Sequence, residues 1–364
     1  MLPTPQSSAK GPGELLRMQK ATLAEALVNR QYAAQPDLAR RYGAAGREKC
    51  LQDTRYHLEY LAEAMDAGDP TLFSNYVAWA KVMLAKRGIP AEDLVRHLEF
   101  TRTVVGEGLG GESGALAVNY LNTSLGMLPS LPSDLPTYLV AMAPHGELAR
   151  DYMDALLKGE RHVASQKILA AVTSGVPVKE IYLNVFQPVQ YEVGRLWQIN
   201  EISVAQEHYC TAATQLIMSQ LYPYIFASEK GAGTLVATCV AGDMHEIGLR
   251  MVADFFEMDG WNTFYLGANT PSQAVVDTVV QRHAQVLAIS ATISFHLRAV
   301  EELIQKVRAH PACKDVKVLV GGYPFRTVPE VWRKMGADGT ATNAQEAITL
   351  ANKLIADGAT HESS

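Results

Sequence analysis

The run Asp243-Met244-His245-Glu246-Ile247-Gly248 combines side chains that can hold a metal ion or a metal-containing cofactor. The imidazole of His245 can coordinate a metal, and the carboxylate of Asp243 can accept a hydrogen bond from the other ring nitrogen. Such a bond fixes the tautomer of the ring and makes the free nitrogen more basic. Gly248 follows at a position where the backbone must turn tightly or let a ligand approach closely. The run therefore predicts a ligand site.

The segments around this run predict a strand, a loop and a helix. Residues 234–240 are apolar and rich in β-branched side chains, whereas residues 249–257 have helical spacing. Further strands are expected at 262–267, 286–290, 317–320 and 339–343, with helices between them and a last helix over 344–355. This alternation predicts a flavodoxin-like, doubly wound parallel sheet over residues 231–357. Ligands of such sheets bind at the carboxyl ends of the strands, where the run lies.

Two other strand ends carry the rest of a recognisable pattern. Ser290 and Thr292 lie at the end of one strand, and Gly321-Gly322 at the end of the next. The spacing resembles the cobalamin-binding domain family, whose pattern is Asp-x-His-x-x-Gly, then Ser-x-Leu about forty residues later, then Gly-Gly. Thr292 departs from it, since Leu is usual there. The alternative is a flavodoxin-like domain with an incidental histidine in this loop.

The resemblance implies a role for each residue of the pattern. His245 would be the lower axial ligand of cobalt, in place of the cofactor's own dimethylbenzimidazole. Asp243 and Ser290 would form a hydrogen-bonded relay behind it. Thr292 would stand beside the cofactor, and three glycines would line the channel for the displaced nucleotide tail: Gly248, Gly321 and Gly322.

Residues 131–230 predict a four-helix bundle that follows a proline-rich connector. The helices are expected at 146–157, 161–173, 178–197 and 204–226, with a kink at Pro188. Ser203 and Gln206 predict a capping box for the last helix. Trp197 then ends one helix while Glu207 and His208 open the next, so all three can converge at one mouth of the bundle.

This second pattern resembles the CarH-type light-sensing cobalamin proteins, whose bundle carries Trp-x9-Glu-His above the upper face of the corrin. The resemblance implies that Trp197 caps the adenosyl group of adenosylcobalamin, and that Glu207 and His208 hydrogen-bond its ribose and edge. These proteins often have a histidine directly after the tryptophan, but this chain has Gln198. A light state ligated through that residue is excluded. The alternative is a buried tryptophan with an incidental Glu-His pair.

Residues 14–130 predict an all-helical domain, which could be globin-like. Helices are expected over 47–67, from Pro70 to Gly88 and over 91–105, and a glycine-rich linker over 106–114. Tyr56 is assigned to the apolar stripe of the first. The second is rich in aromatic side chains, which favours either ordinary core packing or a pocket for a flat chromophore such as biliverdin. The residues proposed for that pocket are His57, Trp79 and His97. A signalling or dimerisation module is the other alternative.

Composition limits the remaining classes. The chain has 364 residues and a net charge of −6 without any basic run, so direct binding to nucleic acid is not expected. No apolar run reaches transmembrane length, which argues against a membrane protein. Four scattered cysteines show no metal or disulfide spacing and fit a reducing cytoplasm. Residues 1–13 and 358–364 are expected to be tails, the first of them disordered.

The resemblances together imply a photocobilin-like relative of the CarH-type proteins. Its expected function is light sensing without catalysis: light breaks the cobalt–carbon bond of adenosylcobalamin, and the bundle or the oligomeric state changes. A homo-oligomer and an unknown signalling partner follow from this. The alternatives are a corrinoid carrier for methyl transfer and the cobalamin-binding subunit of an adenosylcobalamin mutase. The latter would need a partner chain, because no substrate barrel fits into this sequence.

Overall fold

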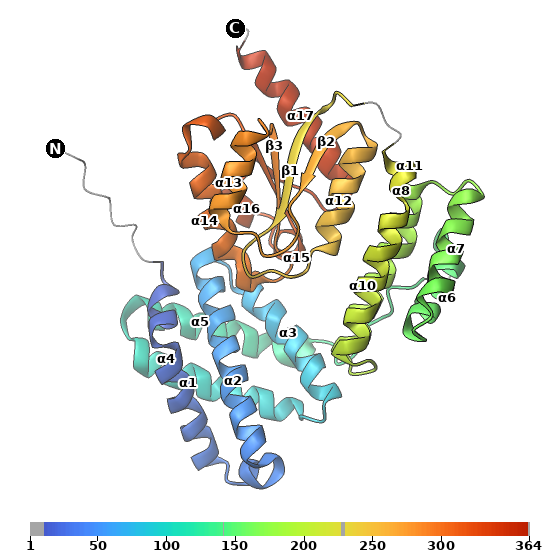
Figure 1. Ribbon diagram of the computed structural model, residues 1–364. Coiled ribbons are helices and arrows are strands. Elements are labelled where there is room, and N and C mark those ends of the chain that lie inside the picture. Colours follow the sequence, from blue (N-terminus) through green and yellow to red (C-terminus); the bar gives the residue numbers. More distant parts are fainter. Residues whose placement is uncertain (1–10, 141, 227–229, 363–364) are drawn as a thin grey trace, which may run out of the picture. The chain divides into compact units, whose positions relative to one another are not determined.

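The computed structural model describes residues 11–140, 142–226 and 230–362, and it divides into two compact units, residues 1–133 and 134–364 (Figure 1). The expected tail 1–13 lies mostly outside the described residues. Gly13, however, is held, because its N–H donates to Asp66 Oδ1 at 2.7 Å. None of the described helices is both long and apolar enough to cross a membrane.

The first unit is built from five long α-helices. They are α1 (Glu14–Ala34), α2 (Asp37–Ala67), α3 (Pro70–Lys86), α4 (Ala91–Leu109) and α5 (Gly111–Met127), followed by a 3₁₀ turn, η1 (Leu128–Ser130). Helix α3 begins as the sequence predicts: Asp69 accepts a hydrogen bond from the N–H of Thr71, and Pro70 occupies the first turn. Gly43, with φ 64°, interrupts α2.

Two expectations for this unit were wrong. The predicted linker 106–114 is almost entirely helical, since α4 runs to Leu109 and α5 begins at Gly111. Its glycines serve close helix packing: a Cβ on Gly108 would lie 2.6 Å from Leu23 Cδ2, and one on Gly106 would lie 3.0 Å from Val118 Cγ2. Tyr56, assigned to the buried stripe of α2, is 47% exposed.

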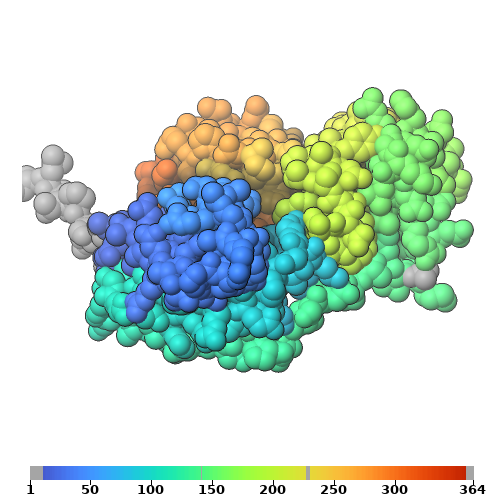
Figure 2. Space-filling model, turned by 90° about the horizontal axis from the view of Figure 1, so that it is seen from below, coloured from blue at the N-terminus to red at the C-terminus, as the bar shows by residue number. Residues whose placement is uncertain are grey.

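The second unit begins with the helical bundle, and its helices lie close to the predicted ranges. They are α6 (Gly146–Leu157), α7 (Arg161–Thr173), α8 (Val178–Ile181), a π-helical turn η2 (Tyr182–Phe186), α9 (Gln187–Gln198), α10 (Val204–Gln220) and α11 (Tyr222–Ile225). The π turn ends two residues before Pro188, which lacks an N–H, so the irregularity lies where a kink was expected. The capping box of Ser203 and Gln206 is present. In Figure 2 the yellow-green α10 lies against the green α6 and α7.

The rest of the second unit is a five-stranded parallel sheet, as predicted. Its strands are β1 (Gly233–Cys239), β2 (Trp261–Tyr265), β3 (Val286–Ser290), β4 (Lys317–Gly321) and β5 (Gly339–Thr340), in the order β2-β1-β3-β4-β5. This is the flavodoxin-like order, which reverses between β1 and β3. Cys239 pairs with Ser290, and Ser290 with Gly321, so the ends of β1, β3 and β4 are level.

Helices cover both faces of this sheet (Figure 1). Helices α12 (Ile247–Met258) and α17 (Ala344–Glu362) contact each other on one face, while α13 (Ser272–Gln281) and α14 (Leu297–Ala309) contact each other on the other. Short elements complete the unit: η3 (Ser294–His296), η4 (Pro311–Cys313), α15 (Tyr323–Thr327) and α16 (Val331–Lys334). Helix α17 continues to Glu362, although a tail was expected from residue 358.

The bundle and the sheet share one hydrophobic core, in which Tyr182 packs on Phe255 of α12 with ring centroids 6.1 Å apart. The hydroxyl of Tyr182 donates to Asp254 Oδ2 at 2.8 Å. Asp254 is only 7% exposed, and burial raises the pKa of its carboxyl to about 6. A carboxylate that is costly to ionise therefore lies between the bundle and α12.

This carboxyl predicts a pH dependence of stability. Its pKa is higher in the folded state than the usual value near 3.8, so its contribution is greatest at low pH and is lost as the pH rises through about 6. Asp254→Asn, which stays neutral, is expected to gain up to about 3 kcal/mol of unfolding free energy relative to the natural chain between about pH 4 and pH 7. Urea unfolding at several pH values measures this difference. Asp315→Asn, at an exposed carboxylate, is the control; an equal gain in both variants would contradict the assignment.

Candidate functional site

The loop after β1 holds Asp243 and His245 in the arrangement that their spacing predicts. His245 Nδ1 lies 2.8 Å from Asp243 Oδ1, and the backbone N–H of His245 donates to the same oxygen at 2.9 Å. Since a carboxylate only accepts, Nδ1 carries the proton and Nε2 is the nitrogen left with a free electron pair. The side chain of His245 is 58% exposed, so this electron pair is open to a ligand.

Asp243 is completely buried, and its charge is stabilised by the groups around it. Burial alone would raise the pKa of its carboxyl, but hydrogen bonds from His245 and from the N–H of Thr292, together with the ring of His296, hold the pKa far below its usual range. In return, the hydrogen bond to Asp243 raises the pKa of His245. Asp243 is thus a fixed anion that orients the imidazole.

The relay to Ser290 differs from the expected one. Asp243 Oδ2 accepts from the backbone N–H of Thr292 at 2.6 Å, and no hydrogen bond joins the Ser290 side chain to Asp243 within the described residues. A backbone donor makes the side chain at position 292 irrelevant to this bond. The replacement of the usual Leu by Thr292 therefore leaves the anchoring of Asp243 intact.

The glycines around the loop leave room for a large ligand. A Cβ on Gly248 or on Gly321 would meet nothing within 4 Å, and neither residue has a positive φ. The protein itself therefore does not require glycine at these positions. Gly322 is different, since its φ is 113° and a Cβ would lie 2.0 Å from the carbonyl oxygen of Ala291. The open space at Gly248 and Gly321, beside an imidazole with a free nitrogen, fits a cofactor whose tail passes over bare backbone.

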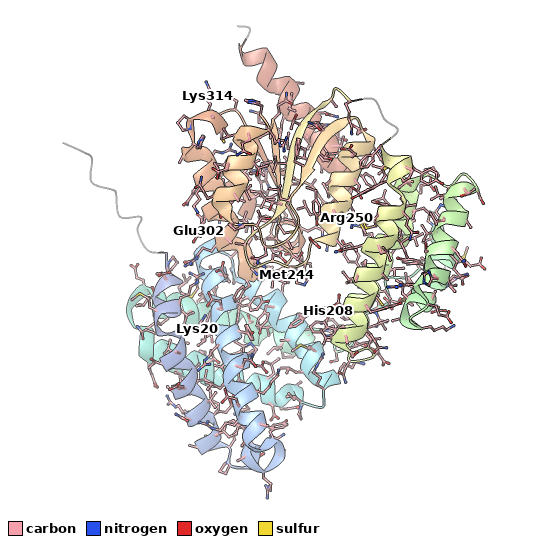
Figure 3. The ribbon with its side chains drawn as sticks, viewed as in Figure 1. Lys20, His208, Met244, Arg250, Glu302 and Lys314 are labelled. Carbon is pink, nitrogen blue, oxygen red and sulfur yellow. The ribbon has the colours of Figure 1, made fainter. Side chains whose placement is uncertain are left out.

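The bundle residues predicted for the upper face lie at the same end of the unit as this loop. Figure 3 labels Met244 in the loop and His208 near the start of α10. Glu207 accepts a hydrogen bond from Thr211 at 3.0 Å and is bonded to His208, whose side chain is 75% exposed. Trp197, in the last turn of α9, is half-buried. Besides Asp243, the negative charge of Glu207 raises the pKa of His245, so the charge at the start of α10 acts on the loop imidazole.

Two residues that sequence reasoning missed connect the loop to the bundle. Gln215 of α10 donates to Glu246 Oε1 at 3.0 Å, while the hydroxyl of Tyr265 and the N–H of Ala268 each donate to Glu246 Oε2 at 3.0 Å. Glu246 directly follows His245, so the carboxylate joins the loop after β1, the loop after β2 and the helix that carries Glu207. In the sequence, the one signal for Glu246 is its position directly after His245, and Gln215 has no signal.

In the first unit, the two histidines proposed for a chromophore pocket lie in a buried polar cluster. His57 Nδ1 lies 2.8 Å from the hydroxyl of Tyr76, and His97 Nδ1 lies 2.8 Å from Gln31 Oε1, with the two rings 5.2 Å apart. Burial lowers the pKa of His57 to about 3, aided by His97, and that of His97 to about 4. Both rings are therefore neutral at physiological pH.

Trp79, the third residue of this proposal, lies nearer the surface. It is 36% exposed and stacks on Tyr76 at 6.2 Å, while Tyr76 stacks on Tyr60 at 3.7 Å. A row of aromatic rings thus runs from the histidine cluster to solvent, because Tyr76 contacts both His57 and Trp79.

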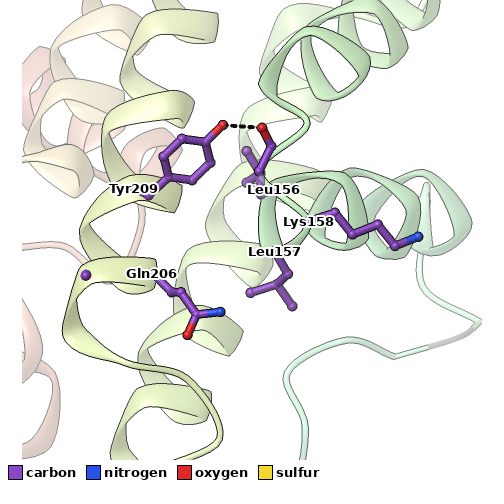
Figure 4. Close-up of a pocket in the computed structure, with 7 residues that line it drawn as sticks. Leu156, Leu157, Lys158, Gln206 and Tyr209 are labelled. Carbon is purple, nitrogen blue, oxygen red and sulfur yellow. Dashed lines mark hydrogen bonds between the residues drawn. The ribbon is translucent and has the colours of Figure 1, made fainter.

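A shallow pocket of about 300 Å³ lies in the bundle, between the end of α6 and the start of α10 (Figure 4). The hydroxyl of Tyr209 donates to the carbonyl of Gly159 at 2.7 Å across it. The residues that line it are Leu156, Leu157, Lys158, Gly159, Ala205, Gln206 and Tyr209. None of them belongs to the predicted cofactor site.

Comparisons with known proteins show what the second unit is similar to. Residues 233–349 and residues 148–222 each match a family model described as a B12 binding domain. Dimethylamine corrinoid protein 3 of Methanosarcina acetivorans is 26% identical over 219 residues, which are 59% of this chain and 100% of that protein. A corrinoid protein of Desulfitobacterium hafniense is 24% identical over 57% of this chain and 97% of its own length.

The fold comparison agrees as well. The structure of the monomethylamine corrinoid protein of Methanosarcina barkeri superposes with a TM-score of 0.52 and 24% identity, over 58% of this chain and all of that one. Residues 13–128 match a different model, described as a phycobilisome protein. The bundle and the sheet are therefore similar to B12 binding domains, whereas the helical first unit is similar to a different family. The relatives are corrinoid proteins, and they do not single out the CarH-type light sensors.

Proposed function

We propose that this protein senses light through adenosylcobalamin, held between the loop of His245 and the mouth of the bundle. The observation that carries the proposal is the oriented imidazole with a free Nε2, whose pKa the charge of Glu207 raises, together with the hydrogen-bonded Glu207–His208 pair at the start of α10. Adenosylcobalamin supplies a cobalt–carbon bond that light can break. His245 would hold the cobalt from below, oriented by Asp243.

The chain's own residues then account for a response. Trp197 and Glu207 would contact the adenosyl group and hold it in the dark. The hydroxyl of Thr211 lies 3.0 Å from Glu207 Oε1 and 3.1 Å from Gln190 Oε1 of α9, and its one proton can bond to either oxygen. A change at Glu207 can therefore shift this proton to Gln190 and so reach two bundle helices. Contacts made in only one of two states are what shifts a conformational equilibrium. We propose a homo-oligomer whose state changes in this way, without catalysis by the chain itself.

A second function, as a corrinoid carrier for methyl transfer, is favoured by a specific observation: the relatives named above include a dimethylamine and a monomethylamine corrinoid protein. These relatives cover only 57–59% of this chain. The role of a methyl carrier therefore gives no reason for the first unit, whereas a light sensor could use it for a second chromophore. A carrier also has no need of a group that grips adenosine. Both functions use the same lower loop.

Green light separates the two functions. The full chain loaded with adenosylcobalamin is expected to show a changed absorption spectrum after illumination, together with a changed sedimentation coefficient. Glu207→Gln is expected to weaken adenosylcobalamin binding by roughly tenfold, as loss of a buried polar contact does, and to leave methylcobalamin binding unchanged. Glu147→Gln, at an exposed carboxylate in the first turn of α6, is the matched control, because it is the other end of α6 that lies beside the start of α10. An unchanged sedimentation coefficient with complete photolysis would contradict light sensing and favour the carrier.

We also propose that the first unit binds a linear tetrapyrrole such as biliverdin without a covalent bond. The supporting observations are the match of residues 13–128 to a phycobilisome protein model, the aromatic row ending at Trp79, and the neutral histidines behind it. Cys50 is the one cysteine between residues 14 and 130. Burial raises the pKa of its thiol to about 11, which makes it a poor nucleophile.

Biliverdin mixed with the full chain is therefore expected to give a red absorption band that survives gel filtration. Trp79→Ala is expected to lower the retained pigment, because it removes the exposed end of the aromatic row. Met18→Ala, at a 65% exposed apolar side chain on α1, is the control. Absence of a retained band, or equal retention by both variants, would show that this row is not the pigment site.

A further inference from the structure

A second histidine lies against the buried carboxylate of the cofactor loop. His296, which ends the turn η3 and precedes α14, is 8% exposed. Its Nδ1 is buried and has no hydrogen-bond partner among the described residues, and it lies 3.5 Å from Asp243 Oδ2. Buried polar atoms are almost always paired, so an unpaired ring nitrogen aimed at a carboxylate requires an explanation.

The ring of His296 is held in this position from two sides. A Cβ on Gly242 would lie 3.4 Å from His296 Nε2, so the ring packs directly on the backbone that precedes Asp243. Phe295 packs edge-on against the same ring, with centroids 5.4 Å apart. The backbone N–H of His296 donates to the carbonyl of Ile293 at 3.1 Å, which fixes the turn. The ring therefore has little freedom to face anything other than the loop.

Asp243 has room for this donor. Its Oδ1 already accepts two hydrogen bonds from His245, whereas Oδ2 accepts one strong bond, from the N–H of Thr292. A carboxylate oxygen can accept two, so one position on Oδ2 is open toward His296. Ser290, the expected partner of the relay, does not fill it within the described residues.

We propose that His296 is a positioning residue for the Asp243–His245 pair: its Nδ1–H, which lies 3.5 Å from Asp243 Oδ2 in the structure, donates to that oxygen in the protein with or without cofactor. With that bond, both carboxylate oxygens are anchored, and Asp243 cannot rotate away from His245 Nδ1. His245 then keeps the tautomer that presents Nε2. The inference rests on the proposed role of His245 as the lower cobalt ligand. It adds His296, directly before α14, as a residue that holds Asp243 in place behind that ligand.

The test compares three variants of the full chain: His296→Leu, which fills the space without a donor; His296→Asn, whose side-chain N–H₂ can replace Nδ1–H; and His310→Leu, at the other end of α14. The first readout is the tautomer of His245 in the protein without cofactor, from the nitrogen chemical shifts of its ring. The second is the affinity for hydroxocobalamin and the absorption spectrum of the bound form.

His296→Leu is expected to lower the Nδ1–H tautomer of His245 and to weaken hydroxocobalamin binding roughly tenfold to a hundredfold, the usual effect of removing an outer partner of a metal ligand. His296→Asn is expected to restore most of both, and His310→Leu to change neither. Equal losses in the Leu and Asn variants would show a packing role only and overturn the proposal. So would an unchanged tautomer and affinity in His296→Leu. If His245→Ala leaves the cobalamin spectrum unchanged, His245 is not the cobalt ligand and the proposed function fails. The role of His296 is still decided in that case, because the tautomer of His245 is measured in the protein without cofactor.

Discussion

His245→Ala is expected to lose the imidazole ligand of cobalt and to bind cobalamin at least roughly tenfold to a hundredfold more weakly, since even outer partners of metal ligands have effects of that size. Any cobalamin that remains should have the spectrum of a form with water or its own base below the cobalt. The fold should survive, because the His245 side chain is 58% exposed and its loss leaves no cavity. Absorption spectra and equilibrium binding measure both effects.

His162→Ala, at an exposed histidine of α7, is the control for this variant. It is expected to bind cobalamin with unchanged affinity and spectrum. If His245→Ala matched the natural chain in both respects, the loop after β1 would not ligate cobalt. If it unfolded, as thermal melting would reveal, the position would be structural rather than a ligand site.

Gly322→Ala is expected to destabilise the second unit by about 2–4 kcal/mol, whereas Gly321→Ala should leave its stability nearly unchanged. Gly322 has a φ of 113°, and the added methyl would lie 2.0 Å from the carbonyl oxygen of Ala291. The backbone would have to move, and the neighbouring loop with it. Gly321 has no such strain, and nothing lies within 4 Å of its Cβ position.

The same pair separates stability from binding, because both glycines were predicted to line the channel for the nucleotide tail. Gly321→Ala is expected to keep the melting temperature of the protein without cofactor and to weaken cobalamin binding, since its methyl would project into the open space. Melting curves and binding titrations of both variants check this. Unchanged binding in Gly321→Ala would remove that residue from the channel, and an unchanged melting temperature in Gly322→Ala would contradict the packing described for it.

Hydrophobic periodicity was sufficient to locate the elements of the second unit. Residues 286–289 are apolar throughout because both faces of a parallel strand are covered, and that pattern depends little on distant contacts. The level ends of β1, β3 and β4 follow from the parallel order, so the sequence also determined that His245, Ser290 and Gly321 lie at one edge of the sheet.

Side-chain exposure was less predictable in the first unit. Tyr56 has helical spacing with buried neighbours, yet it is 47% exposed, because the width of a buried stripe depends on which helices cover it. The glycines between 106 and 114 suggested a linker, but close approach of α1 and α5 to α4 compensates for their low helix propensity. Neither the helices that flank Tyr56 nor the packing of α1 and α5 on α4 can be predicted from the local sequence.

At the site around His245, too, the sequence predicted some of the contacts and the tertiary structure decided the others. The sequence by itself determined that an aspartate orients the imidazole, because two residues of separation in a tight loop bring Oδ1 to Nδ1. Only the tertiary structure decided what holds the second oxygen: the backbone of Thr292, with His296 beside it, in place of the Ser290 side chain. Hydrogen-bond partners within a buried site depend on ångström-scale loop geometry, which residues 49 and 53 positions away in the chain set only after folding.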